Sequence, residues 1–263
     1  MNFIRGINAF NNYFVNVGTN LSSSIPKCQK SPMDYLKRHY VRAFIYFLQL
    51  LLKLKQKLQN LIPVSIPISI LKLLKATVDK PLETLFISSF SIGIFPNHLK
   101  LPNVIPGYKK DSQFSLSNYR PISLLSVFNK RLEKLVSKRL LDFLEKENIL
   151  FDKQFGFLTN HSTDHANLSI TDKIQRQLMS EIFPVVIFLD FSKAFDTVNH
   201  AILIRKLGYY GIRGIASSWF SSYLNNRQQT VTVNNTTSAP ATISCGVPQG
   251  SVLGPITYSS LYK

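Results

Sequence analysis

The sequence predicts an α+β domain, in which helices and strands belong to one fold. The run from Val185 to Leu189 follows a proline and has the β-branched and aromatic composition of a strand buried on both faces. Apolar residues between Leu125 and Leu144 recur at helical spacing and predict an amphipathic helix. Residues 227–233 and 241–245, joined by a turn rich in Asn and Thr, predict a β-hairpin.

An aspartate, Asp190, ends the predicted strand. A carboxylate at this position costs several kcal/mol to desolvate unless it is paired or binds a cation, so Asp190 needs a partner. The alternative is that Asp190 only caps the turn that follows. A second acid, Asp196, comes after Phe195 in the same segment.

Helical patterns also precede the strand. Residues 7–21 form an amphipathic segment, and residues 70–94 predict one or two helices around Pro81. Ser162 or Thr163 is expected to cap a further helix. The apolar face of that helix carries Ala166, Ile170, Ile174 and Leu178.

The chain has a large excess of positive charge. Its 263 residues include 31 Lys and Arg against 14 Asp and Glu, which gives a formal charge of +17. Such an imbalance favours a polyanionic partner, either nucleic acid or an anionic membrane. The hydrophobic content of 45% is that of a globular protein and excludes a disordered tail.

Cysteine content and hydropathy indicate a reducing compartment. Cys28 and Cys245 provide neither a disulfide framework nor a metal-ligand spacing. The most apolar segment, Ala43–Leu52, is too short to span a membrane and lies too far from the N-terminus for a signal peptide. We therefore expect a nuclear or cytoplasmic protein, not secreted, with no transmembrane segment and no membrane partner. Basic residues within 37–57 leave a membrane-surface helix as an alternative.

Basic residues at two places are candidates for binding phosphate. Lys110 lies in a predicted turn, and Arg120 follows in a short loop made rigid by Pro121. A guanidinium and an ammonium group on such a loop suit phosphate recognition, although a solvated turn is the alternative.

The second place is the predicted helix 125–144. Its lysines Lys130, Lys134 and Lys138 form one stripe, on which like charges repel by about a few tenths of a kcal/mol per pair. A nucleic-acid backbone would reverse this repulsion, whereas a plain solvated face is the alternative.

Glycines and prolines between Gly246 and Pro255 predict a rigid turn around Gln249. Little side-chain bulk surrounds Gln249, so a flat or charged ligand can approach the backbone of Gly250 closely. Taken in isolation, the segment is only a turn. Upstream of it, residues 200–211 and 215–224 predict two short helices.

Three motifs, in their order along the chain, carry a family resemblance. They are SNYRPISLL (Ser117–Leu125), FLDFSKAFDTVNH (Phe188–His200) and GVPQGSVLGP (Gly246–Pro255). Together they resemble the reverse transcriptase domain of non-LTR retrotransposons, the jockey-like and related elements. The N-terminal AFNNYFVNVGTNL resembles the segment that links the endonuclease of such elements to their polymerase, whereas residues 41–60 depart from the expected pattern.

This resemblance implies an α+β right-hand polymerase fold. Residues 95–183 would form the fingers and residues 184–263 a partial palm, with the thumb absent. Residues 1–94 would form an N-terminal linker region that is partly divergent. The oligomeric state is not implied.

The resemblance also implies a metal site. Asp190 matches the first metal-binding aspartate of the family, and the backbone carbonyl of Phe191 would add a hard oxygen ligand. The complete family site holds two Mg²⁺ ions, which assist the addition of deoxynucleoside triphosphates to a DNA primer on an RNA template. Asp196 also matches a family position, and we expect it to have a structural role.

Five residues match positions that bind the incoming nucleotide. Phe195 corresponds to the aromatic ring under the sugar, which would select deoxynucleotides by shape. Lys110 and Arg120 match residues that hold the triphosphate. Gln249 and Gly250 match the loop that packs beside the incoming nucleotide and the template.

One family signature, an aromatic and a small residue followed by paired aspartates, is not found in the 263 residues. No two aspartates adjoin, and no acid follows Asp196. One carboxylate leaves the charge of two divalent ions uncompensated, so we expect this chain to be inactive by itself. The alternatives are a non-catalytic nucleic-acid-binding remnant of a retroelement and a basic membrane-surface protein. Without the missing hairpin, the predicted strand would keep an exposed edge, which predicts aggregation.

Overall fold

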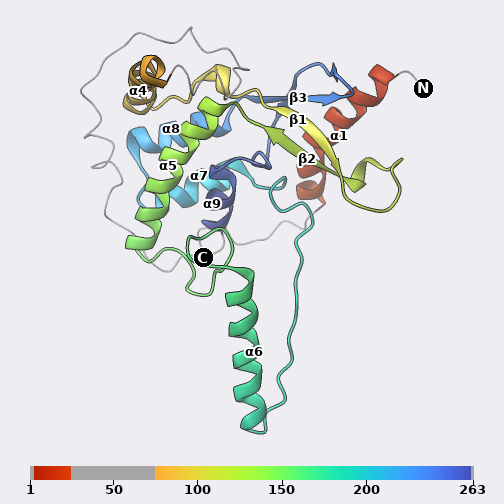
Figure 1. Cartoon of the computed structure of the whole chain (residues 1–263), viewed down its shortest axis with the longest axis vertical. Coiled ribbons are helices and arrows are strands. Elements are labelled where there is room, and N and C mark those ends of the chain that lie inside the picture. The colour runs from red at the N-terminus through yellow and green to blue at the C-terminus, as the bar shows by residue number, and fades with distance from the viewer. Residues whose placement is uncertain (1–2, 25–74, 262–263) are drawn as a thin grey trace.

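A computed structural model describes residues 3–24 and 75–261, which form a mixed α and β body with a long projection (Figure 1). The α+β class is confirmed. The elements, in chain order, are α1 (Phe3–Ser23), α4 (Lys75–Ile92), β1 (Asn103–Tyr108), β2 (Tyr119–Leu124), α5 (Val127–Lys146), α6 (Thr163–Met179), α7 (His200–Tyr209), α8 (Gly214–Leu224), β3 (Arg227–Val233), β4 (Thr236–Thr237), β5 (Ala241–Ile243) and α9 (Leu253–Ser259).

Within the described residues, five strands form one sheet. Its order is β2-β1-β3-β4, and β5 pairs with β3. Strands β1 and β2 are antiparallel, with Gly107 opposite Arg120, whereas β1 and β3 are parallel. The predicted hairpin is confirmed, because β3 and β5 pair antiparallel with Arg227 opposite Ile243.

Helix α1 packs on this sheet, although the two lie far apart in the sequence (Figure 1). Ile7 and Phe14 are buried against Val104 of β1 and Val231 of β3. The side-chain amide of Asn11 donates to carbonyl oxygens in the β3–β5 hairpin. The amphipathic segment predicted at 7–21 is therefore a helix whose apolar face completes a second, smaller core.

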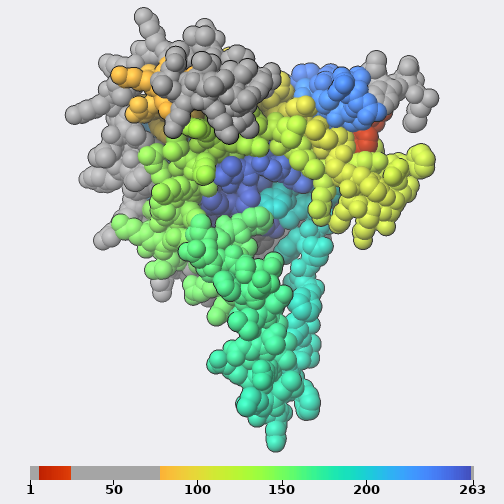
Figure 2. All heavy atoms as spheres, in the orientation of Figure 1, coloured from red at the N-terminus to blue at the C-terminus, as the bar shows by residue number. Residues whose placement is uncertain are grey.

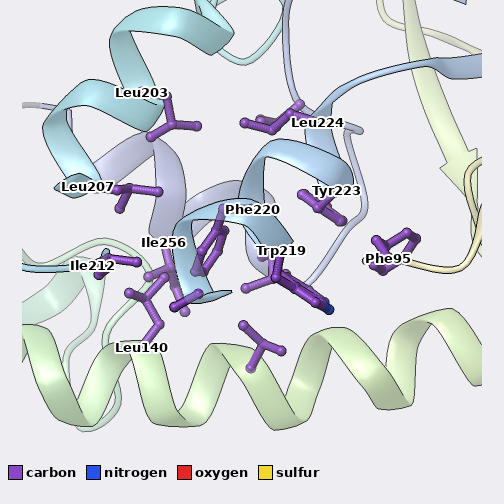
Figure 3. Close-up of a cluster of buried hydrophobic side chains, with 14 of the residues drawn as sticks. Phe95, Leu140, Leu203, Leu207, Ile212, Trp219, Phe220, Tyr223, Leu224 and Ile256 are labelled. Carbon is purple, nitrogen blue, oxygen red and sulfur yellow. The ribbon is translucent and has the colours of Figure 1, made fainter. Parts of the chain in front are cut away.

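The main core lies among α4, α5, α7, α8 and α9. Figure 3 shows side chains of α5, α7 and α9 gathered around those of α8. Trp219 stacks on Tyr223 at a centroid distance of 5.8 Å and meets Phe95 edge-on at 5.4 Å. These contacts bury the largest aromatic side chains of α8, which accounts for the position of this helix at the centre of the body.

The predicted helices are confirmed around this core. Helix α5 buries Leu132, Val136, Leu140 and Leu144, which recur at one-turn spacing. The pattern around Pro81 forms a single helix, α4, with the proline inside it. The segments split by the glycines near 211–214 are α7 and α8.

A projecting arm, residues 163–191, consists of α6 and the extended chain that returns from it (Figure 2). Ser162 caps α6 as predicted, because its hydroxyl accepts from the backbone N–H of His165. The predicted apolar face of α6 is not buried: Ile170 is 41% and Leu178 is 49% exposed. No residue of α6 is buried.

The buried strand predicted at Val185–Leu189 is wrong. Residues 182–191 are extended but belong to no sheet in the described part of the chain, and Val185 and Ile187 are 87% and 77% exposed. A strand is held by backbone hydrogen bonds to a neighbouring strand, and the five described strands pair only with one another. Apolar composition indicates that a segment tends to be buried but does not supply the partner that buries it.

Some predictions lie outside the described residues. These are the membrane-surface helix within 37–57, the divergent residues 41–60, and Cys28. The domain boundaries at 95 and 184 remain predictions. Among residues 3–24 and 75–261, no helix combines the length and apolar character that crossing a bilayer requires.

Candidate functional site

The tight turn at residues 246–250, the Gln249 turn, forms the centre of the candidate site. Gly246 and Gly250, in the turn that the glycines and prolines predicted, have positive φ angles of 86° and 99°. A Cβ added to Gly250 would lie 3.1 Å from the carbonyl oxygen of Ser123 in β2. The turn therefore needs glycine both for its backbone conformation and for its close packing on β2.

Hydrogen bonds fasten the start of the turn to the segment after the arm. The backbone N–H of Gly246 donates to the carbonyl oxygen of Val198 at 2.8 Å, and that of Val247 donates to the carbonyl oxygen of Phe195 at 2.8 Å. Nε2 of His200 lies 2.7 Å from the carbonyl oxygen of Gly246, to which it donates as an N–H. These bonds join two motifs that are far apart in the sequence.

Gln249 connects this segment to the sheet. Its side-chain Nε2 donates to both carboxylate oxygens of Asp196, at 2.8 and 2.9 Å. Its backbone oxygen accepts from the N–H of Ser123 at 2.8 Å. Because Ser123 and Arg120 share β2, the strand that carries Arg120 is fixed relative to the Gln249 turn.

The carboxyl group of Asp196 is partly buried beneath the turn. Burial raises its pKa above the usual value, whereas the hydrogen bond from Gln249 and the charge of Lys193 lower it. The pKa of His200 is lowered mainly by burial, which favours the neutral ring that donates to Gly246. The junction of the two motifs thus holds a partly buried acid and a partly buried histidine.

Phe195 packs beside the turn and contacts two other rings. Its centroid lies 4.8 Å from that of Tyr258 and 5.8 Å from that of Phe157, which meets it edge-on. The side chain is half-buried at the border of the main core. These ring contacts fix the orientation of Phe195.

The two phosphate-binding candidates lie in one hairpin. Arg120 was expected in a loop, but it is an exposed residue of β2, because backbone pairing with Gly107 extends the strand through it. Lys110 is exposed in the connection between β1 and β2. Within the described residues neither side chain forms an ion pair, so both charges can interact with an anion.

Asp190 and Phe191 are exposed at the end of the arm. In the described part of the chain, no hydrogen bond or ion pair joins Asp190 to Arg120, Phe195 or the Gln249 turn. No three His, Cys, Asp or Glu side chains gather there as a metal cluster. The structure thus brings β2, Phe195 and the Gln249 turn together, and leaves Asp190 on a segment outside the sheet.

The three lysines of α5 form an exposed stripe. Lys130, Lys134 and Lys138 all face solvent on the side of the helix away from the core. Their neighbour Arg131 pairs with Asp79 of α4 at 4.0 Å. No described acid pairs with the three lysines.

The sequence did not predict the contacts of three residues in the site. Asp196 and Ser123 both bind Gln249, and His200 binds Gly246. Each contact joins segments that are distant in the sequence, and local patterns carry no information about such pairing. The one usable signal was the position of Asp196 and His200 inside the same short motif as Asp190.

Comparisons with known proteins match this chain to reverse transcriptases. Residues 108–262 match the family described as "Reverse transcriptase (RNA-dependent DNA polymerase)". Over 188 residues the chain is 36% identical to "Probable RNA-directed DNA polymerase from transposon BS" of Drosophila melanogaster, which covers 68% of this chain and 20% of that protein.

Two further relatives come from the same fly. The "RNA-directed DNA polymerase from mobile element jockey" is 32% identical over 182 residues, covering 68% of this chain and 19% of that protein. The "Probable RNA-directed DNA polymerase from transposon X-element" is 34% identical over 148 residues, which cover 54% of this chain and 16% of that protein. The chain spans about a fifth of the length of these relatives. The family match and the sequence identity to these relatives show that the chain belongs to the reverse transcriptase family of non-LTR retrotransposons.

Proposed function

We propose that this chain supplies the nucleotide- and template-binding part of an RNA-directed DNA polymerase. The observation that carries the proposal is the position of the Gln249 turn, which is bonded on one side to Asp196 and on the other to the strand of Arg120. A polymerase needs such an arrangement, because it must hold the triphosphate, the sugar and the templating base in fixed relation.

Each candidate residue has a role in this proposal. Arg120 and Lys110 would hold the triphosphate, since both present positive charge on one hairpin and neither pairs with a described acid. The ring of Phe195 would lie under the sugar and exclude a 2′-hydroxyl. Gln249 and Gly250 would pack against the base pair formed with the template, held in place by the packing of the turn on β2.

The residues present fit part of a Mg²⁺ site. Asp190 and the carbonyl of Phe191 are hard oxygen donors on an exposed segment, which suits Mg²⁺ and its retained waters. When bound, the metal would stabilise the charge of the triphosphate. No two aspartates adjoin in the sequence, so we propose that these residues bind nucleotide and template without completing a two-metal site by themselves.

The architecture and partners follow from the same proposal. The β1–β2 hairpin and α5 belong to the fingers, and the segments from 184 onward belong to the palm. The lysine stripe of α5 would contact the phosphates of the RNA template and DNA primer. Such a protein works where its template is found, in the nucleus or the cytoplasm.

A nucleotide-binding measurement tests the proposal. The chain is titrated with fluorescent dATP and ATP analogues in the presence of Mg²⁺, and we expect dATP to bind more tightly. Phe195→Leu keeps the side chain apolar but removes the flat ring, so it should reduce the preference for dATP. Phe114→Leu is the matched control, because Phe114 is fully exposed. Equal binding of both nucleotides by the unmodified chain contradicts the role of Phe195.

Primer extension separates an enzyme from a binding remnant. We expect no extension of a DNA primer on an RNA template by this chain, with or without Asp190→Asn. Extension that depends on Asp190 contradicts our proposal that the metal site is incomplete.

Filter binding addresses the template. Binding of RNA should weaken with salt, and the triple change Lys130→Ala, Lys134→Ala and Lys138→Ala should lower the salt slope by about 1 for each phosphate that a lysine no longer neutralises. Lys173→Ala on the arm is the control. If the triple variant keeps the same salt slope of RNA binding, the template does not contact the lysine stripe.

A further inference from the structure

Glu133 is a buried acid in the middle of α5 that has no role in the proposed function so far. Its side chain is 0% exposed. One carboxylate oxygen, Oε2, accepts from the backbone N–H of Val252 at 2.7 Å and from that of Leu253 at 3.4 Å. The other, Oε1, accepts from the hydroxyl of Tyr223 at 3.0 Å. The carboxylate therefore ties α5 to α8 and to the chain just after the Gln249 turn.

Arg227 lies close to this carboxylate. Its guanidinium is buried over the rings of Tyr223 and Phe95, at 4.8 and 5.9 Å, and Nη1 donates to the carbonyl oxygen of Tyr223. Burial raises the pKa of Glu133, whereas the bond from Val252 and the charge of Arg227 lower it. An apolar residue of similar size could fill this place in the core at little cost in stability. The presence of an acid here therefore suggests that its hydrogen bonds have a specific role.

Of the two backbone N–H groups that Glu133 binds, that of Val252 lies between the Gln249 turn and α9, and that of Leu253 begins α9. Helix α9 begins at Leu253 without a side-chain cap from its own N-terminal residue. The start of the turn is held by His200 and its middle by Ser123. Glu133 adds an attachment just after the turn, at Val252 and Leu253.

We propose that Glu133 is a positioning residue for the Gln249 turn. It sets the distance between the turn and α5, the helix that carries the lysine stripe, and so couples the nucleotide side of the site to the template side. The coupling between these two sides rests on the proposed function. The attachment of the turn itself does not.

Glutamine at position 133 provides a discriminating change. Its amide oxygen can accept from Val252 and Leu253 while its NH₂ group donates to the hydroxyl of Tyr223, so the change keeps these contacts and removes the negative charge that strengthens the bonds from the two backbone N–H groups. Glu133→Gln is nearly the same size, and the core packing should survive. Tyr223→Phe is the matched variant, because it removes the bond to Oε1 and leaves both bonds to Oε2.

The experiment follows the amides of Val252 and Leu253 by NMR in the full chain labelled at Val and Leu. In Glu133→Gln we expect these two amide protons to shift upfield and to exchange with solvent about tenfold faster, because a neutral acceptor replaces a charged one. In Tyr223→Phe we expect both amides to keep their shifts and protection. Val104 in β1 serves as the distant reporter and should not change in either variant.

The nucleotide titration is repeated with the same variants. Glu133→Gln should weaken dATP binding about tenfold, because displacement of the turn misaligns the bound nucleotide. If the unmodified chain binds no nucleotide, the proposed function fails, and the exchange of Val252 alone decides whether Glu133 positions the turn. Unchanged Val252 and Leu253 amides in Glu133→Gln overturn the inference, whatever the titration gives. The inference is also overturned if these two amides exchange equally fast in Glu133→Gln and in Tyr223→Phe. General loosening of the core would then explain the faster exchange.

Discussion

The body and the arm contain similar apolar residues and place them in opposite surroundings. Phe220 in the body is 2% exposed, whereas Phe188 in the arm is 81% exposed. In the body, each apolar segment has a partner: helices pack on helices, and α1 covers the sheet. The extended chain of the arm joins no sheet among the described residues, although its composition is as apolar. Burial thus depends on neighbouring elements as much as on the segment itself.

The largest expected effect comes from truncating one phenylalanine in each region. Phe220→Ala should lower the free energy of unfolding by about 3–5 kcal/mol, because it opens a cavity among α5, α8 and α9. Phe188→Ala should change it by less than about 0.5 kcal/mol, since the ring already faces solvent. Chemical denaturation measures both. A comparable loss in both variants means that the arm is covered in solution.

Two glycines of α1 give the next contrast. A Cβ at Gly18 would lie 1.7 Å from the backbone oxygen of Asp196, so Gly18→Ala must push α1 away from the site. We expect a loss of about 1–3 kcal/mol, as for an overpacked core. Gly6 has no atom within 4 Å of an added Cβ, and Gly6→Ala should stabilise the helix by up to about 1 kcal/mol. Thermal denaturation of both variants tests this. An unchanged melting temperature in Gly18→Ala would mean that α1 does not pack closely against the backbone of Asp196.

The elements predicted correctly are those that local sequence determines. The helical repeat of α5, the hydroxyl of Ser162 and the glycines of the Gln249 turn all act within a few residues of one another. The three motifs that carry the family resemblance also meet in the structure, through Ser123, Asp196 and Gln249, while the roles of the site residues remain predictions. The sequence did not predict that Arg120 would lie in a strand, because that depends on Gly107 opposite it.

The failures share one cause, which is dependence on a distant partner. Residues 185–189 have the composition of a strand and no strand beside them in the described part of the chain. Glu133 was not singled out, although it lies in the same buried stripe of α5 as Asn129 and Ser137. An acid among buried positions of an amphipathic helix was a usable signal that such a residue has a specific bonding partner.

A smaller effect, which depends on pH, is expected at Asp196, beneath the Gln249 turn. The pKa of Asp196 is raised by burial, so the folded state holds its proton more tightly than the unfolded chain. The contribution of this carboxyl to stability is therefore greatest in acid and is lost as the pH rises through the raised pKa.

Asp196→Asn removes this titration and keeps an oxygen that can accept from Gln249. We expect the variant to be at least as stable as the unmodified chain at about pH 7.5, with a flatter dependence of melting temperature on pH. A lower melting temperature at that pH would show that the ionised carboxylate stabilises the fold, contrary to the effect of its burial.

The smallest effect on stability, and the clearest test of the arm, comes from charging its exposed extended chain. Val185 and Ile187 are both exposed on this chain, which can pair with another molecule through its apolar edge. Val185→Lys with Ile187→Lys should change the free energy of unfolding by less than about 0.5 kcal/mol. It should raise the soluble fraction on expression, because lysine on an edge opposes pairing between strands.

Added charge alone could improve solubility, so the control places two lysines elsewhere. Gln113→Lys with Phe114→Lys adds the same charge in the exposed β1–β2 connection. If the arm is the site of aggregation, only the first pair restores solubility, and light scattering during heating should separate the two variants. Equal improvement would assign the effect to net charge, and the exposed apolar chain of the arm would then not be what drives association.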